Sequence, residues 1–401
     1  MAGKRLSRRG FMGAAGAAGW LAAGAAAGAD SPAASAPPPA GTPVIDITDL
    51  YHPPQDPGDN VDLVAAYALP GVDLRAVVLD VTERYRKPHV TADGAYNDPL
   101  GGRDPGFIPV HQLNCLFQRD VPAAAAPFLP MRAPEDPMTD APPFQTAGIE
   151  LMFRVLRESP VPVEIVSFGS ARPLAVAYNR NPQLLREKVR LIHLCAGAAP
   201  RGFLEWNVNL DVHAFVRILR SDLPVAIYPC GTQKDAFDLG PHNTFWRLPD
   251  FSLIRRVAPP LRRYLAYAFE RSARPDFLAA MEQDPPPEVV DRIAALPHNV
   301  WETDVWMRAA NHRLVRRPGA GGRIVPAGEV KPDDAPVRTE LLPCTIDVDD
   351  DGQFDFAPTD KPSNFSIFYR ADPQAHQAAL IEALPELYAG FAVDEPFPRR
   401  S

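Results

Sequence analysis

The chain has 401 residues, enough for one large domain or two ordinary ones, and its 46% hydrophobic and 22% charged residues support a packed core and exclude global disorder. Its 49 acidic residues exceed its 41 basic ones, for a net charge of −8, which argues against a general nucleic-acid-binding protein. No apolar run reaches the roughly 20 residues that a membrane-spanning helix needs, so we expect no stable membrane insertion of the mature chain.

Residues 1–29 have the parts of an export signal in the usual order. Arg8 and Arg9 stand in the segment SRRGFM, a weakly apolar Ala/Gly stretch follows, and Ala27-Gly28-Ala29 offers a small-residue cleavage site. This order is typical of a twin-arginine signal peptide, and the alternative is a disordered basic tail. With residues 30–42 as a Pro/Ala-rich linker, we expect the mature protein to be periplasmic or secreted.

After the linker, short apolar runs alternate with helical patterns. Strands are predicted at residues 43–48, 73–81, 161–168, 189–195 and 223–228. Helices are predicted at residues 61–69, 145–158, 173–179, 211–220, 252–271 and 373–388. The β-α-β-α order with nearly continuous apolar strands predicts a mostly parallel, Rossmann-like α/β sheet with helices on both faces.

The domain boundaries and loops follow from the same patterns. Residues 43–338 are expected to form the α/β domain and 339–401 a C-terminal β/α appendage packed on it. Residues 84–110, 282–288 and 316–336 are rich in Gly, Pro and acidic residues and are predicted to be loops. The spacing of the four cysteines matches no zinc-site pattern, and we expect at most one disulfide.

Acidic residues crowd the end of the first predicted strand, where open parallel sheets bind their ligands. They are Asp46, Asp49, Asp56, Asp59 and Asp62. Carboxylates this close repel one another unless something positive neutralises them, and oxygen ligands of this kind suit a hard cation such as Ca²⁺ or Mg²⁺. The alternative is a solvated acidic loop with a helix-capping Asp.

A second group of polar residues follows the strand predicted at 189–195. Glu205 and Asn207, in the segment EWNVNLD, stand two residues apart, and on an extended segment they project to the same side. A carboxylate and a carboxamide so placed can hold the vicinal hydroxyls of a sugar. Together with the first Asp cluster and the turn SFGSAR at 167–172, this order resembles the nucleoside hydrolase superfamily of the inosine–uridine-preferring type, over residues 44–211.

The resemblance implies a nucleoside hydrolase-like fold, a small-molecule nucleoside or glycoside as substrate, hydrolysis of an N-ribosyl bond, and Ca²⁺ as cofactor. It implies that Asp49 binds the metal and also activates water as the catalytic residue. The implied metal ligands are Asp49, Asp59, Asp62, the main-chain oxygen of Phe168, and Asp304 in the late segment WETDVW. The implied substrate-binding residues are Glu205 and Asn207, which grip the ribose, and Asp46, which supports the site from close by.

The sequence departs from the family's pattern at several positions. Residues 50–58 are inserted, and Val61 stands beside Asp62 where the family has a second Asp, a loss for which Asp59 is the expected replacement. Thr303 stands where the family has its leaving-group His. The substitutes for that group are His242, His298 and His312. Two alternative functions therefore stay open: a non-catalytic sugar- or ligand-binding descendant of the family, and a hydrolase of a different glycoside. The oligomeric state is open as well, with a homo-oligomer as one alternative.

Two further charged patterns have structural explanations. The segment DVDDDGQFD at 347–355 has the acidic spacing of a calcium loop, but Pro358 occupies its twelfth position. We expect an acidic β-turn there, with an incidental calcium site as the alternative. The Arg-rich stretch 255–274 is expected to be a solvated helix face paired with acidic side chains.

Overall fold

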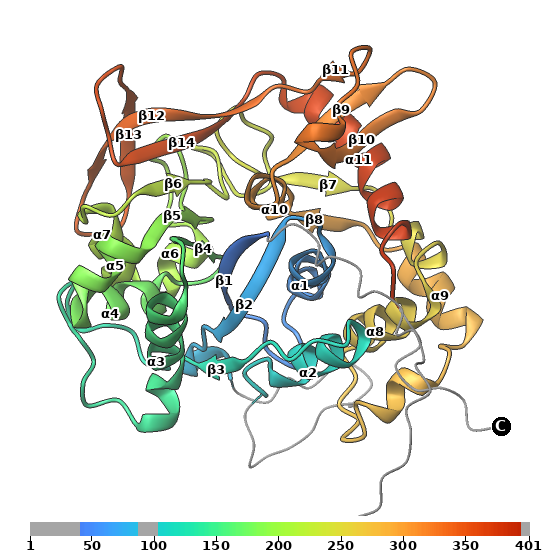
Figure 1. The fold of residues 1–401 in the computed structure, drawn as a ribbon, viewed down its shortest axis with the longest axis horizontal. Helices are drawn as coiled ribbons and strands as arrows, with labels where there is room; N and C mark the ends of the chain where they lie inside the picture. Colours follow the sequence, from blue (N-terminus) through green and yellow to red (C-terminus); the bar gives the residue numbers. More distant parts are fainter. Residues whose placement is uncertain (1–40, 87–102, 394–401) are drawn as a thin grey trace, which may run out of the picture. The chain divides into compact units, whose positions relative to one another are not determined.

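The structure is a computed structural model that describes residues 41–86 and 103–393 (Figure 1). The predicted export signal and most of the predicted linker lie outside these residues, as does most of the predicted loop at 84–110. Over the two described ranges, no helix has the length and apolar character needed to cross a bilayer.

The strands of the described residues form one large sheet and two small ones. The strands of the large sheet are β1 (Thr42–Thr48), β2 (Val72–Leu79), β3 (Ala123–Ala125), β4 (Val163–Ser167), β5 (Val189–Leu194), β6 (Val225–Ile227), β12 (Thr339–Val348), β13 (Phe354–Pro358) and β14 (Phe365–Arg370). The small sheets contain β7 (Trp246–Leu248) with β8 (His298–Val300), and β9 (His312–Arg317) with β10 (Gly321–Pro326) and β11 (Ala335–Pro336).

The large sheet runs in the order β13-β12-β14-β6-β5-β4-β1-β2-β3, and all neighbours from β14 to β3 are parallel. Within it, β3-β2-β1-β4-β5-β6 is the strand order of a doubly wound sheet, which reverses between β1 and β4. The predicted fold class, a mostly parallel sheet in an α/β arrangement, is confirmed.

Helices cover both faces of this sheet (Figure 1). One core contains apolar residues of α1 (Gly58–Ala68), α2 (Phe107–Leu116), α8 (Pro259–Phe269), α9 (Pro287–Ala294), α10 (Thr303–Ala309) and α11 (Pro373–Ala389). The other contains those of α3 (Pro143–Glu158), α4 (Arg172–Arg180), α5 (Pro182–Lys188), α6 (Trp206–Leu210) and α7 (Val212–Leu219). Successive strand residues alternate between the cores: Val44 belongs to the first and Ile45 to the second.

Short 3₁₀ helices complete the described secondary structure, at Glu83–Tyr85, Ser252–Arg255, Ala279–Glu282 and Ala327–Glu329. Three sequence-based expectations are corrected. Helix α2 begins at Phe107, inside the predicted loop 84–110, and strand β10 lies inside the predicted loop 316–336. The segment that carries Asn207 is the short helix α6 rather than an extended chain.

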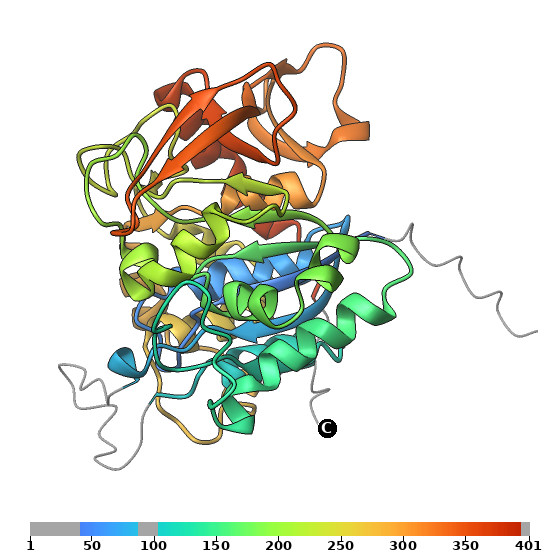
Figure 2. The same ribbon diagram turned by 90° about the vertical axis from the view of Figure 1, so that its left-hand side faces the viewer.

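The C-terminal segment extends the large sheet. Strand β14 pairs in parallel with β6, and β12 then pairs antiparallel with β14, so the orange-red strands continue the sheet in Figures 1 and 2. The acidic segment 347–355 is the turn between β12 and β13. There Arg201 pairs with Asp349 at 2.7 Å and with Asp355 at 3.1 Å. The acidic-turn interpretation therefore describes this segment.

Candidate active site

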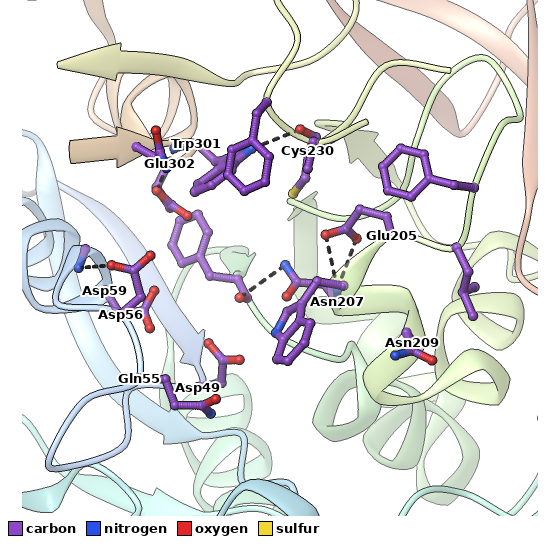
Figure 3. Close-up of a pocket in the computed structure, with 18 residues that line it drawn as sticks. Asp49, Gln55, Asp56, Asp59, Glu205, Asn207, Asn209, Cys230, Trp301 and Glu302 are labelled. Carbon is purple, nitrogen blue, oxygen red and sulfur yellow. Dashed lines mark hydrogen bonds between the residues drawn. The ribbon is translucent and has the colours of Figure 1, made fainter. Parts of the chain in front are cut away.

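A cavity of about 500 Å³ opens where β1, β4, β5 and β6 end (Figure 3). This is the carboxyl edge of the sheet at the point where the strand order reverses, the position at which doubly wound sheets bind ligands. Its volume falls in the range of roughly 300–1,000 Å³ typical of small-molecule sites. Of the described residues, those that line it with carboxylates are Asp49, Asp56, Asp59, Glu205 and Glu302, and those that line it with aromatic rings are Phe168, Phe203, Trp206, Phe237 and Trp301.

The loop after β1 and the start of α1 supply the first carboxylates. Asp49 directly follows the buried strand β1, so the sheet fixes its backbone at the cavity. The Oδ1 atom of Asp56 accepts a hydrogen bond from the backbone N–H of Gly58 at 2.8 Å, which satisfies a free donor at the start of α1. Asp59 follows in the first turn of α1 and lines the same cavity.

The carboxyl groups at and beside the cavity raise one another's pKa. Burial is the largest cause of the raised pKa of Asp49, and the charges of Asp80 and Glu302 add to it. Burial and the charges of Glu302 and Asp59 raise the pKa of Asp62. Close, buried carboxylates with few positive neighbours are the electrostatic condition that a bound cation relieves.

A smaller adjoining cavity, too narrow to admit a water molecule, is lined by the predicted residues that lie deeper. Asp46, Asp59, Asp62, Phe168 and Glu302 contribute to its lining. Asp46 is predicted from the resemblance to support the substrate, but it is absent from the lining of the large cavity. Burial raises its pKa to about 8, and its Oδ1 has no hydrogen-bond partner. Among the described residues, no group of three or more His, Cys, Asp or Glu is already arranged to hold a metal ion.

The predicted late ligand Asp304 lies outside both cavities. It occupies the first turn of α10, and its Oδ1 lies 3.1 Å from the Nε2 of His376, with both side chains buried. Glu302, two residues earlier, lines both cavities instead. Glu302 is the N-cap of α10 and Asp304 lies in its first turn, so the two side chains leave the helix start in different directions, which the segment WETDVW alone does not reveal.

Glu205 and Asn207 both line the large cavity, and both also make structural contacts. Glu205 is the N-cap of α6: its carboxylate accepts backbone N–H groups of Asn207 at 3.1 Å and of Gly197 at 2.9 Å. Burial raises the pKa of Glu205, and these backbone hydrogen bonds oppose the rise. The Nδ2 of Asn207 donates to the carbonyl of Cys195 at 2.9 Å and to that of Phe168 at 3.4 Å. Asn207 thus connects the ends of β4 and β5.

A buried arginine network below the cavity was not anticipated from the sequence. Arg172, which is 0% exposed, pairs with Asp80 at 3.1 Å and with Asp211 at 3.4 Å. Asp80 also accepts the backbone N–H of Ser170, which fixes the turn after β4. The available signal was an acidic residue, Asp80, near the end of the apolar strand predicted at 73–81.

The upper wall of the cavity is aromatic (Figure 3). Trp301 donates its Nε1 hydrogen to the carbonyl of Cys230 at 2.9 Å, and its ring packs against Phe245 with centroids 5.3 Å apart. The sulfurs of Cys195 and Cys230 lie 3.7 Å apart, and all four cysteines are free thiols. The histidines considered as leaving-group acids, His242, His298 and His312, do not contribute to the lining.

Comparison with known proteins supports the resemblance read from the motifs. No family model matches the chain. The pyrimidine-specific ribonucleoside hydrolase RihA of Citrobacter koseri is 26% identical over 194 residues, which are 43% of this chain and 57% of that protein. The chain is similar to ribonucleoside hydrolases. The RihA of Salmonella arizonae is 26% identical over 192 residues, or 42% of this chain and 56% of the relative, so the match spans a little over half of these curated proteins.

Among solved structures, a plant nucleoside hydrolase aligns with 88% of this chain and 100% of its own, at 15% identity and a TM-score of 0.49. An inosine–uridine-preferring nucleoside hydrolase from Bacillus anthracis aligns with 87% of this chain and 99% of its own, at 11% identity and a TM-score of 0.42.

Proposed function

We propose that the protein hydrolyses the N-ribosyl bond of nucleosides. The observation that carries this proposal is the meeting, in one cavity at the reversal point of the sheet, of carboxylates from the first strand–helix unit with the Glu205–Asn207 segment after β5. The sequence similarity to pyrimidine-specific ribonucleoside hydrolases over 194 residues supports it.

We further propose that one divalent cation, Ca²⁺, binds beside the cavity. The donors suit a hard cation, because they are carboxylates together with a main-chain carbonyl, and the unpartnered Oδ1 of buried Asp46 lies in the same small cavity. The residues that would hold it are Asp49, Asp59, Asp62, the carbonyl of Phe168 and, in place of Asp304, Glu302. Because the described side chains form no complete ligand set, binding requires them to adjust. The bound ion would lower the pKa of a water molecule and orient sugar hydroxyls.

Three side chains of the protein then have separate roles in the reaction. Asp49 takes a proton from the attacking water, since its carboxylate lines the cavity where the substrate and the water would lie. Asn207, held by the carbonyls of Cys195 and Phe168, presents its amide group to the ribose. The carboxylate of Glu205 fixes Asn207 by accepting its backbone N–H, and it adds negative charge near the sugar. Contacts that strengthen as positive charge develops on the ribose ring are the ones that accelerate cleavage.

The second candidate is binding without hydrolysis. The specific observations in its favour are that the Glu205 carboxylate is engaged by backbone N–H groups and that Asp304 is paired with His376. In both cases we propose that the twin-arginine segment around Arg8 and Arg9 directs the protein out of the cytoplasm.

The test is release of reducing sugar from uridine and inosine by the purified protein in the presence of Ca²⁺. Asp49→Asn should lower turnover by at least ~100-fold, the scale of general-base catalysis. Asp350→Asn is the matched control, because that side chain is 89% exposed and lies in the distant β12–β13 turn. Nucleoside binding without sugar release would favour the second candidate, and equal activity of the Asp49 and Asp350 variants would refute the role of Asp49.

A further inference from the structure

We infer that this cavity selects nucleosides whose base is a positively charged aromatic ring, such as an N-ribosylpyridinium, over nucleosides with a neutral base. The inference rests on the proposed function, which it makes more specific. Three features carry it: the sign of the charge in the lining, the aromatic surface exposed at the cavity, and the chemistry of the departing base.

The lining has one sign of charge. In the part of the chain that the structure describes, every charged side chain that lines the cavity is a carboxylate, from Asp49, Asp56, Asp59, Glu205 and Glu302. One divalent cation offsets two negative charges, so the lining stays acidic after the proposed ion binds. A cleft of one sign concentrates ligands of the opposite sign.

The aromatic surface at this cavity is unusually open. Phe237 is 62% exposed and Trp206 is 49% exposed, and both line the cavity. Trp301 is fixed beside Phe237: its Nε1 donates to the carbonyl of Cys230, and the centroid of its ring lies 5.8 Å from that of Phe237. A cation over the face of Trp, Tyr or Phe is attracted by the negative charge of the ring face. Rings placed next to carboxylates therefore suit a flat ligand that is also a cation.

The departing base gives the chemical reason. In an N-ribosylpyridinium the electron pair of the C1′–N bond returns to the ring nitrogen, and the base leaves as a neutral pyridine without receiving a proton. The water oxygen bonds to C1′, and the proton that it loses passes to Asp49 and then to solvent. One cation and one water thus yield ribose, a neutral pyridine and one proton. A neutral base departs as an anion unless it is protonated, and a wall of carboxylates destabilises an anion.

The experiment separates recognition of the ring from turnover. 1-Methylnicotinamide, which is a cation because its ring nitrogen is methylated, and nicotinamide, its neutral counterpart, are compared as ligands of the Ca²⁺-loaded full chain by calorimetry. We expect the cation to bind at least ~10-fold more tightly. Nicotinamide riboside and uridine are then compared as substrates, with an expected preference of at least ~10-fold in kcat/KM for the charged nucleoside.

Exposed phenylalanines provide matched variants. Phe237→Leu should reduce the cation-to-neutral binding ratio at least ~3-fold, and Phe237→Tyr, which keeps the ring face, should retain it. Phe144→Leu is the control, because Phe144 is 55% exposed and does not line the cavity. Equal affinity for the two ligands would overturn the inference, even if uridine is hydrolysed and the proposed function stands. Cation-selective binding with no hydrolysis of either nucleoside would support the inference about recognition and refute the proposed activity.

Discussion

Replacing Arg172 with Met should lower the free energy of unfolding more than the same replacement at an exposed arginine. The guanidinium is 0% exposed, pairs with Asp80 and Asp211, and donates to the carbonyls of Val81 at 2.7 Å and Pro127 at 2.8 Å. Met matches much of the aliphatic length but leaves two buried carboxylates without their partner. Breaking a buried ion pair by removing one member costs about 3–5 kcal/mol.

Urea unfolding followed by tryptophan fluorescence measures this loss. With a slope of about 3 kcal/mol per molar urea, the midpoint should fall by about 1 to 1.7 M. Arg220→Met is the matched control: its partner Asp350 lies 2.8 Å away, and the two side chains are 45% and 89% exposed. An exposed pair of this kind contributes about 0–1 kcal/mol.

A double variant tests the cause of the loss. Asp80→Asn in the Arg172→Met background removes one unpaired buried charge, so it should restore part of the lost stability. If Arg172→Met and Arg220→Met lower the midpoint equally, the buried network does not stabilise the fold as reasoned. If Asp80→Asn lowers stability further, the loss comes from packing rather than from unpaired charge.

Three more predictions concern the metal, the late acidic position and export. A chelator should lower the melting temperature of the wild type but not of Asp62→Ala, because a ligand at a hundredfold excess over its dissociation constant adds about 2.7 kcal/mol; identical melting of the wild type with and without chelator would count against the metal. Asp304→Asn should cost about 1–3 kcal/mol through its contact with His376, while KM and kcat for uridine stay unchanged; a selective loss of kcat would return Asp304 to the active site. Replacing Arg8 and Arg9 with Lys should retain precursor in the cytoplasm, as cell fractionation would show, and normal export of that variant would contradict the signal assignment.

Strands β1, β2, β4, β5 and β6 of the large sheet were predictable because they are buried on both faces, and helices α1, α3, α4 and α7 were predictable because each keeps an apolar side. That acidic residues after β1 would lie at the ligand-binding edge of the sheet was predictable, and Asp49 and Asp59 both line the cavity. The directions of side chains near helix starts were not predictable. If a helix begins one residue earlier or later, the side chains of its first residues point in different directions. Glu205 therefore caps α6 while it lines the cavity, and Glu302 rather than Asp304 faces it. The pairing of Arg172 with Asp80 joins residues that are 92 positions apart, which no local pattern records.

The contact between the first and last helices has a consequence during synthesis. In α11 the hydroxyl of Tyr388 donates to the carbonyl of Val61 in α1, a partner 327 positions earlier in the chain. At roughly 5–20 residues per second, α1 leaves the ribosome about 15 to 65 seconds before α11 is made. Until α11 is made, the apolar residues of the first core that it covers stay open, and from the synthesis of β6 onward the edge of that strand lacks β14. The nascent chain therefore presents both an uncovered apolar face and an unpaired strand edge to molecular chaperones, and a chain that terminates before β14 retains both.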